Sequence, residues 1–313
     1  LLAYLNKEHD YMEEVDFEFI HQVAPGGKPS PSLAKQGIKL FPQVMPEITY
    51  TWFNMEDPVV GGYTAEKVAL RRAMTLGYNI NEEIQVIRKG QVLAAQSPIP
   101  PGVAGYDKTF KSPTAEYSPS KAKALLDLYG YADRDGDGYR ELPDGSRLSL
   151  EIASPPTSEF RPQDELWRKS MDAIGIRVTF NKSTFSEQLK AAKTGKLQMR
   201  MSAWIADYPD ADNFLQLLYG PNTGQANDAR FKLAAFDKLY LQTQRMPDTP
   251  ERTKLYQEMS RLMLAYAPWK LGVNRIYTHL ISPWVLGYKK HPITLTPWKY
   301  VDIDMAKQKA ARE

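Results

Sequence analysis

Carboxylates and aromatic rings occur together between residues 203 and 214, where the chain reads AWIADYPDADNF. Trp204 offers a flat apolar face on which a ligand can stack, and Asp207 offers a negative charge for a cationic group. Side chains of these two types in one short segment favour a ligand pocket.

Two other interpretations of this segment remain open. An enzyme could use two of the carboxylates of Asp207, Asp210 and Asp212 as an acid/base pair, as glycosidases do. A structural interpretation makes Asp210 or Asp212 the N-cap of the next helix and places Trp204 in the core.

A second acidic group lies between residues 133 and 141, in the run DRDGDGYRE. The alternating carboxylates of Asp133, Asp135 and Asp137, with a following glycine, match the start of a calcium loop, in which they converge on a hard cation. The match weakens afterwards, because Arg140 takes a position that is normally hydrophobic and a strand is expected to follow. A polar hairpin with Asp-Gly turns is the alternative.

The last fifty residues are rich in aromatic side chains that have polar tips. Such side chains suit a sugar, a peptide or an amphipathic ligand, and the alternative is a packed edge of the core. The aromatic residues concerned are Trp269, Tyr277, Trp284, Tyr288, Trp298 and Tyr300, and Arg275 lies among them.

The composition removes several classes of function. The 313 residues carry 40 Lys and Arg against 37 Asp and Glu, a net charge of +3, which argues against a nucleic-acid binder. The absence of cysteine excludes thiol nucleophiles, disulfides and thiolate metal sites. The four histidines lack metal-ligand spacing and the Gly-Gly pairs lack a phosphate-binding pattern, so no cofactor is predicted. No stretch of about 18 apolar residues, the length of a membrane-spanning helix, is present.

The elements that must position these residues are clearest between residues 148 and 204. Hydrophobic periodicity predicts strands at 148–152, 176–180 and 197–204, with helices at 164–174 and 186–193 between them. This β-α-β-α-β order predicts parallel strands joined by right-handed crossovers. Ligands of open α/β sheets gather at the carboxyl ends of the strands, which places the segment from Trp204 to Tyr208 where a site is expected.

Further elements are predicted on both sides of this unit. Alternating apolar residues predict a strand at 47–54, and apolar residues at three- and four-residue steps predict one helix over 66–87. Two more helices are expected at 228–244 and 251–266. The tail from 270 to 303 is expected to form short strands and loops.

Several segments, in the right order, resemble the periplasmic oligopeptide- and dipeptide-binding proteins, which are the family 5 solute-binding proteins of ABC importers. Residues 117–126 are similar to the family's Y-x-P-x-K-A-x-x-L-L helix, and residues 204–214 resemble the motif at its ligand cleft. The other matching segments are residues 50–54, 68–74, 97–101 and 283–288.

The resemblance implies an α/β fold. The whole protein is then a clamshell of two lobes, a class II periplasmic binding protein, and this chain forms one lobe with three layers and a mixed or parallel sheet. Residues 1–45 are then the end of the first lobe and a hinge crossing, residues 46–280 the second, ligand-binding lobe, and residues 281–313 the return to the first lobe and the C-terminal tail. On this view the chain is a fragment that begins at Leu1 inside the family's sequence and lacks most of the first lobe.

The resemblance also implies a function. A protein of this family captures oligopeptides or dipeptides in a closing cleft and delivers them to the membrane permease of an ABC importer. It is expected to be a monomer without enzymatic activity, located in the periplasm or tethered outside the membrane of a Gram-positive organism. The alternatives are the same fold with a sugar, a cationic metabolite or a metal complex as ligand, and, more distantly, a carboxylate-pair hydrolase.

The resemblance assigns roles to particular residues. Asp207 is similar to the carboxylate that pairs with the α-amino group of the peptide, and Trp204 to an aromatic residue that lines the cleft. Some relatives carry an arginine where this chain has Met201, so Arg275 is the substitute candidate for binding a peptide carboxylate. The complete set of expected ligand-binding residues is Asp207, Trp204, Tyr208, Tyr50, Trp52, Asn54 and Arg275.

Overall fold

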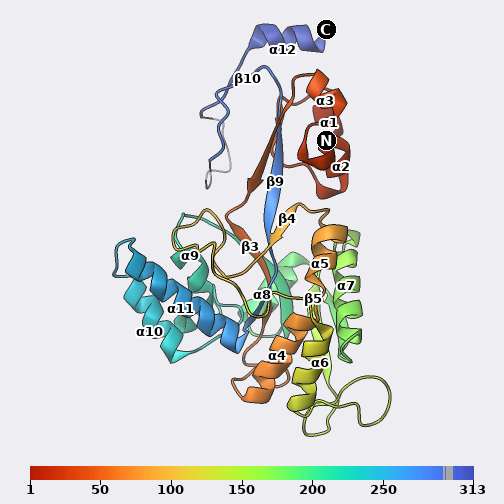
Figure 1. Ribbon diagram of the computed structural model, residues 1–313, viewed down its shortest axis with the longest axis vertical. Coiled ribbons are helices and arrows are strands. Elements are labelled where there is room, and N and C mark those ends of the chain that lie inside the picture. The colour runs from red at the N-terminus through yellow and green to blue at the C-terminus, as the bar shows by residue number, and fades with distance from the viewer. Residues whose placement is uncertain (292, 294–298) are drawn as a thin grey trace.

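The computed structural model describes residues 1–291, 293 and 299–313 of the chain. Figure 1 shows a narrow part, which contains both termini, above a wide part in which most helices lie. The long strand β9 (Val273–Ile281) runs from the wide part into the narrow part.

Five strands form a mixed sheet in the wide part, in the order β6-β5-β7-β3-β8. Their bounds, with those of the two helices between them, are β3 (Glu47–Phe53), β5 (Ser149–Ser154), α7 (Arg161–Asp172), β6 (Arg177–Lys182), α8 (Phe185–Lys193), β7 (Met199–Ile205) and β8 (Trp269–Leu271). β5 pairs in parallel with β6 and β7, whereas β3 pairs antiparallel with β7 and β8. The parallel β-α-β-α-β unit expected from the sequence is therefore confirmed.

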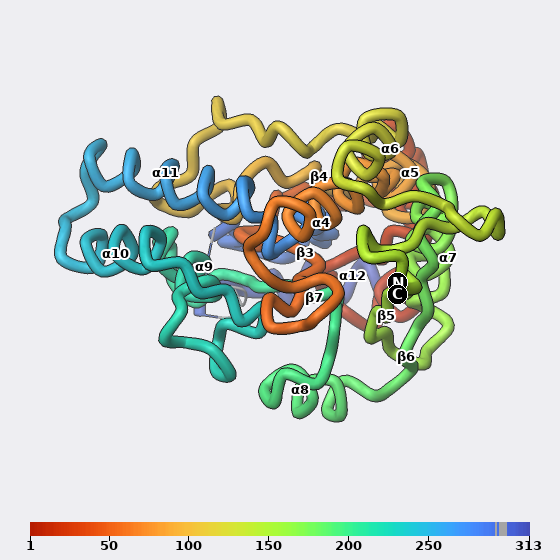
Figure 2. Tube along the Cα trace, turned by 90° about the horizontal axis from the view of Figure 1, so that it is seen from below, coloured from red at the N-terminus to blue at the C-terminus, as the bar shows by residue number. Residues whose placement is uncertain are grey.

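Helices cover both faces of this sheet, as Figure 2 shows from below. One face packs against α9 (Asp212–Leu215), α10 (Ala234–Thr243) and α11 (Pro250–Tyr266), and the other against α4 (Ala65–Gly77), α6 (Pro119–Leu128) and α7. In β3 the alternating side chains of Ile48, Tyr50 and Trp52 pack on the first face, and Phe53 packs on the second. The three-layer α/β fold class is confirmed.

The helix expected over residues 66–87 is wrong in one respect, because it is broken. α4 ends at Gly77, and Tyr78 is extended, with φ −75° and ψ 124°. The side chain of Asn79 then accepts a hydrogen bond from the backbone N–H of Glu82 at 3.1 Å and starts α5 (Ile80–Glu82), which a π-helix at Glu83–Ile87 follows. Both pieces keep an apolar face toward the core, so periodicity alone does not reveal the break.

The helix expected over residues 228–244 begins later, as α10 at Ala234. The side chain of the fully buried Asn227 donates hydrogen bonds to the carbonyl oxygens of Tyr219 and Phe231 and accepts one from the N–H of Phe231. These bonds hold the preceding segment in a loop.

A second sheet, in the narrow part, forms around β9. Its other strands, β1 (Tyr11–Met12), β2 (Lys39–Val44) and β4 (Val92–Ala94), all pair antiparallel with β9. The expectation of only short strands in the tail is wrong here, because β9 is nine residues long. Its polar residues, such as Asn274, Thr278 and His279, are buried between partner strands and mask the strand pattern in the sequence.

Two of the connections between the parts are the one between β2 and β3 and the one at Gly272 between β8 and β9. A Cβ atom at Gly272 would lie 2.7 Å from the carbonyl oxygen of Thr49, so only glycine allows this close approach. The Gly272 N–H donates to the same carbonyl oxygen at 2.9 Å. The second connection is thus bonded to β3, the strand that follows the first.

Short elements complete the narrow part. They are α1 (Leu2–Leu5), α2 (Ile20–Val23), α3 (Pro31–Lys35), β10 (Val285–Leu286), β11 (Asp302–Ile303) and α12 (Met305–Arg312). Among the described residues, no helix combines the length and the apolar character that a bilayer crossing requires.

Candidate ligand-binding site

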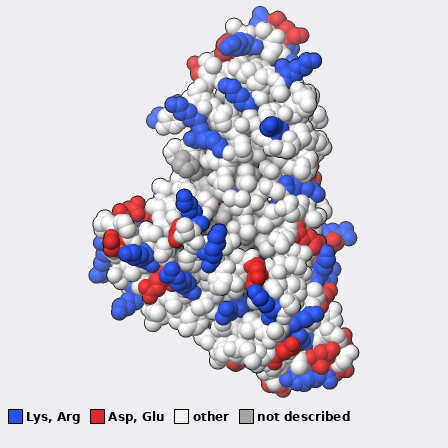
Figure 3. Space-filling view, in the orientation of Figure 1, with Lys and Arg blue, Asp and Glu red and all other residues white. Residues whose placement is uncertain are grey.

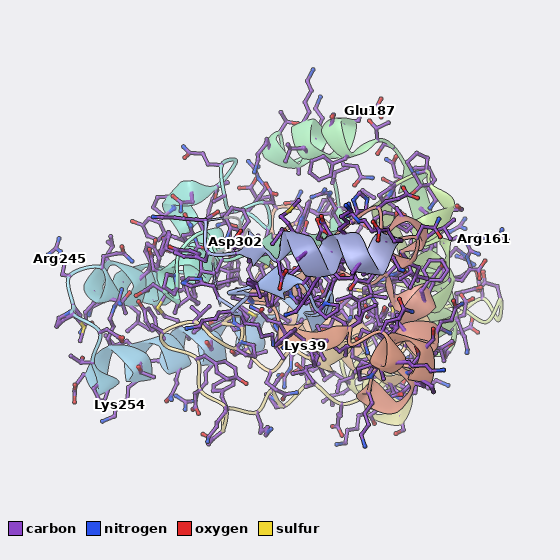
Figure 4. All side chains as sticks on the ribbon, turned by 90° about the horizontal axis from the view of Figure 1, so that it is seen from above. Lys39, Arg161, Glu187, Arg245, Lys254 and Asp302 are labelled. Carbon is purple, nitrogen blue, oxygen red and sulfur yellow. The ribbon has the colours of Figure 1, made fainter. Side chains whose placement is uncertain are left out.

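The order of the parallel strands creates an opening in the wide sheet. β6 and β7 lie on opposite sides of β5, so right-handed crossovers place α7 and α8 on opposite faces. Figure 4 shows the two helices, marked by Arg161 and Glu187, on different sides of the molecule. The crevice beyond the carboxyl ends of β5 and β7 is therefore the switch point at which α/β sheets bind ligands.

One edge of β7 is open at this crevice. β5 pairs only with Met199 and Arg200 of β7, whereas β3 pairs along its whole length, from Met199 to Ile205. Within the described part of the chain, residues 201–205 pair with no strand on the side of β5. A cavity of about 280 Å³ lies here, between β3, β7 and β8 and the first turns of α7 and α8.

Trp204 and Asp207 are held together at the end of β7 by one amide side chain. Asn213, on α9, is 1% exposed, and its Oδ1 accepts hydrogen bonds from Trp204 Nε1 at 3.1 Å and from the Asp207 N–H at 3.0 Å. Its Nδ2 donates to Asp207 Oδ2 at 3.1 Å. The sequence interpretation did not assign Asn213 a role, although its place in the segment 203–214 was the available signal.

The Asp207 side chain is exposed beyond this contact. Its Oδ1 has no hydrogen-bond partner among the described residues, so it is free to accept one from a ligand. Tyr208 next to it is 41% exposed, and its hydroxyl donates to Asp212 at 2.7 Å. Burial and the Asp212 carboxylate raise the pKa of Tyr208 to about 12, so it remains a neutral donor at neutral pH.

The other two carboxylates of the segment are occupied by protein partners. Asp210 pairs with Arg252 at 2.6 Å and accepts hydrogen bonds from the Tyr256 hydroxyl at 3.0 Å and the Asp212 N–H at 2.9 Å. Asp212 accepts from the side chains of Tyr208 and Gln244. Both carboxylates thus bond to other parts of the fold, but the expectation that one of them is the N-cap is wrong, because α9 has Ala211 as its N-cap.

The three candidates on β3 have different positions. Tyr50 lines the cavity and stacks on Trp269 with ring centroids 3.9 Å apart. Trp52 is 1% exposed and donates to Ser202 at 3.2 Å, and the buried Asn54 donates to two backbone carbonyls. The expected ligand contacts of Trp52 and Asn54 are therefore corrected: both side chains support the sheet from within the core.

Arg275 lines the cavity but is already paired. Its guanidinium makes two parallel bonds of 2.7 Å to the carboxylate of Glu47, which is 1% exposed. This bidentate pair uses the Nε and Nη2 edge of the guanidinium, and the Glu47 carboxylate already neutralises its charge. The geometry therefore does not favour Arg275 as the carboxylate anchor.

The acidic loop does bring its carboxylates together. Oxygens of Asp133, Asp135, Asp137 and Glu141 lie within 4.8 Å of one another. Several of them already accept hydrogen bonds from backbone N–H groups of the turn, and Asp137 pairs with Arg177 at 2.6 Å. This is the hydrogen bonding of a polar hairpin, and calcium binding stays an untested prediction.

The aromatic residues of the tail do not form one site. Trp269 and Trp284 are buried, whereas Tyr288 and Tyr300 line a separate cavity of about 540 Å³ in the narrow part. Trp298 lies outside the described residues.

The charges on the face of the molecule drawn in Figure 3 are mixed. Acidic side chains are interspersed among the basic ones on that face, which does not carry the continuous basic surface of a nucleic-acid binder.

Comparisons with known proteins agree with one another. The model of the bacterial extracellular solute-binding proteins, family 5 Middle, matches residues 2–226. Di/tripeptide-binding protein 2 of Pseudomonas aeruginosa is 28% identical over 238 residues, 75% of this chain and 42% of that protein. Heme-binding protein A of Haemophilus influenzae is 27% identical over 273 residues, 85% of this chain and 46% of that protein.

The solved structures show the same fold. The periplasmic binding protein DppA from Helicobacter pylori, in complex with the peptide STSA, superposes with a TM-score of 0.77 at 23% identity, over 97% of this chain and 54% of that one. AppA from Bacillus subtilis, in complex with a nonapeptide, gives a TM-score of 0.78 at 17% identity, over 96% and 57%. The chain thus spans about half the length of the relatives it matches.

Proposed function

The chain belongs to the bacterial extracellular solute-binding proteins of family 5, and on this basis we propose that it carries the ligand-binding lobe of a protein that captures short peptides for an ABC importer. In this proposal residues 46–280 form that lobe, and residues 1–45 and 281–313 belong to the other side of a closing cleft. The whole protein is a monomer outside the cytoplasm that passes its ligand to a membrane permease. It binds its ligand without turnover.

The observation that carries this proposal is the open edge of β7 with Asp207 at its end. In an antiparallel pair, alternate residues of β7 direct their N–H and C=O groups away from β3, toward the crevice. An extended peptide can add there as a strand, which gives affinity through main-chain hydrogen bonds and tolerates many side chains. Its α-amino group then meets the free oxygen of Asp207.

This placement also gives the ligand a direction and a length. A peptide whose amino group lies at Asp207, beyond the end of β7, runs antiparallel to β7 toward Met201. Five residues of an antiparallel strand span about 17 Å. The open edge from Met201 to Ile205 therefore accommodates peptides of about two to five residues.

A second candidate ligand is haem, because the relative named Heme-binding protein A aligns with 85% of this chain. Native mass spectrometry of the full-length protein, as purified and after addition of di- and tripeptides or haemin, distinguishes the two. We expect bound mass in the range of short peptides, displaced by an added tripeptide. Retention of haemin with no peptide binding would contradict peptide capture.

Replacement of Asn213 by alanine is expected to lower peptide affinity roughly tenfold and to destabilise the fold by about 1–3 kcal/mol. The reason is that Asn213 fixes both Trp204 and the Asp207 carboxylate. Isothermal titration calorimetry and urea unfolding measure the two effects. The control is Asn181→Ala, which removes an exposed amide on β6; an equal loss of affinity in both variants would contradict the role of Asn213.

A further inference from the structure

A buried lysine without a hydrogen bond lies in the wall of the cavity. Lys270, on β8, has a side chain that is 5% exposed, and its ammonium lies 3.5 Å from the ring centroid of Tyr78 and 5.7 Å from that of Trp167. Among the described residues it donates no hydrogen bond, and the nearest carboxylate oxygen, of Glu83, is 3.9 Å away. The ammonium faces aromatic rings and the cavity.

Glu83 does not fully compensate this charge, because it has other partners. It accepts a hydrogen bond from the Tyr78 hydroxyl at 2.9 Å and lies 3.7 Å from Nε of Arg88, which is itself buried without a hydrogen-bond partner. One carboxylate is thus shared by two cations, Lys270 and Arg88. This wall of the cavity carries one positive charge more than its carboxylate can neutralise.

A second polar group of the same cavity is also unsatisfied. Gln163, on α7, is 7% exposed, and its Oε1 is buried with no hydrogen-bond partner among the described residues. Burial lowers the pKa of Lys270 to about 8, which is the signature of an ammonium with too little compensation. Unsatisfied buried polar groups are costly, and they persist where a ligand completes them.

We infer that Lys270 binds a carboxylate of the ligand, while Gln163 accepts a hydrogen bond from a ligand N–H. This rests on the proposed peptide function and supplies the carboxylate anchor that Arg275 does not. Thr51 is the register partner of both Met201 and Lys270, so the lysine side chain emerges near the Met201 end of the open edge. A peptide that begins at Asp207 directs its carboxyl end there.

The carboxylate can be the C-terminus of the peptide or an acidic side chain, and matched peptides separate the two. Isothermal titration calorimetry of the full-length protein compares a tripeptide with its C-terminal amide, and a glutamate-containing tripeptide with its glutamine form. We expect at least tenfold tighter binding of the acid in one pair. That pair identifies the source of the carboxylate.

Replacement of Lys270 by methionine is expected to abolish this preference, so that acid and amide bind within about twofold of each other. Glu83→Gln is the matched control. It keeps the Lys270 ammonium and removes the Glu83 carboxylate, which competes with a ligand carboxylate for that ammonium, so the preference for the acid form should be retained or increased. Equal binding of acids and neutral forms by the wild type would overturn this inference and leave the proposed peptide function intact. Binding of no peptide at all would overturn both.

Thermal unfolding separates ligand binding from a structural role. Because the ammonium is poorly compensated, Lys270→Met should keep or raise the melting temperature. The single variant leaves the buried Glu83 carboxylate with less compensation, which could prevent the protein from folding. The double variant Lys270→Met/Glu83→Gln removes both charges and avoids this problem. A double variant that folds and still prefers the acid form would show that Lys270 serves only as a counterion of Glu83.

The preference for the acid form should also depend on pH. Lys270 must be protonated to bind a carboxylate, and its pKa in the free protein is about 8. The ratio of acid to amide affinity should therefore be constant below pH 8. Above pH 8 the ratio should fall, by up to tenfold per pH unit. The neighbouring Tyr78 stays protonated because burial and Glu83 raise its pKa well above 10, and Trp167 is neutral. Titration of the peptide α-amino group affects both ligands equally and cancels in the ratio. A ratio that is flat from pH 7 to 9.5 would contradict the role of Lys270.

Discussion

Replacement of Asp207 by asparagine is expected to weaken binding of a free-amine tripeptide roughly 100-fold, with little change in stability. The substitution keeps the size of the side chain and one oxygen for Asn213, but it removes the charge that we propose pairs with the peptide ammonium. An ion pair that a closing cleft takes out of water is costly to break, because the peptide ammonium then remains buried without a partner. Isothermal titration calorimetry of the full-length protein measures the loss.

The control for this prediction is the N-acetylated tripeptide. It has no ammonium, so wild type and Asp207→Asn should bind it with the same weak affinity. Asp212→Asn, five residues further on, alters a carboxylate that accepts from protein side chains and should change tripeptide affinity less than about threefold. Equal affinity of wild type and Asp207→Asn for the free-amine peptide would remove Asp207 from the site.

Replacement of Arg71 by methionine is expected to destabilise the protein by about 4 kcal/mol. Arg71, on α4, is fully buried, and its guanidinium donates to the carbonyl oxygens of Val60 at 2.6 Å, Gly62 at 2.9 Å, Tyr266 at 2.8 Å and Ala267 at 3.1 Å. These bonds join α4 to a loop and to the end of α11. Methionine fills the space but leaves all four carbonyls without a donor.

Urea unfolding followed by circular dichroism measures this loss in the full-length protein. Arg72→Met changes the next residue of the same helix, which is partly exposed and has no hydrogen bond from its Nε, and should cost less than about 1 kcal/mol. Arg71 does not line the cavity, so peptide affinity at a temperature where the variant is folded should be unchanged. A stability loss no larger than that of Arg72→Met would contradict the assignment.

The parallel unit of the fold could be predicted from the sequence because its signals are local. Alternating apolar residues, helical periodicity and terminal glycines lie within each element from residue 148 to 204, and the handedness rule then sets the arrangement. The same rule predicted Trp204 and Asp207 beside the crevice, and the structure has them at the end of β7, past Ala203, the last β7 residue that lines the cavity. β9 was missed because its pairing with β1, β2 and β4 buries polar residues such as Asn274 and His279, and no local pattern records pairing between distant segments.

The site could be predicted only in part, for the same reason. Asp207 stands out as a charge after a strand, but Asn213 matters only because folding brings its amide to Trp204 and Asp207. Lys270 has no sequence signal at all, since its burial against Tyr78 arises from a contact between segments nearly two hundred residues apart. Arg275 is a plausible anchor from the sequence alone, because its bidentate pair with Glu47 forms only when distant segments meet in the fold.

A crystal structure of the full-length protein with a bound tripeptide tests the central claim most directly. The account predicts an extended peptide that is hydrogen-bonded to the open edge of β7 between Met201 and Ile205, with its amino nitrogen about 3 Å from the Asp207 carboxylate and its chain running toward Met201. A peptide bound away from this edge, or in the opposite direction with its carboxylate at Asp207, would contradict the account.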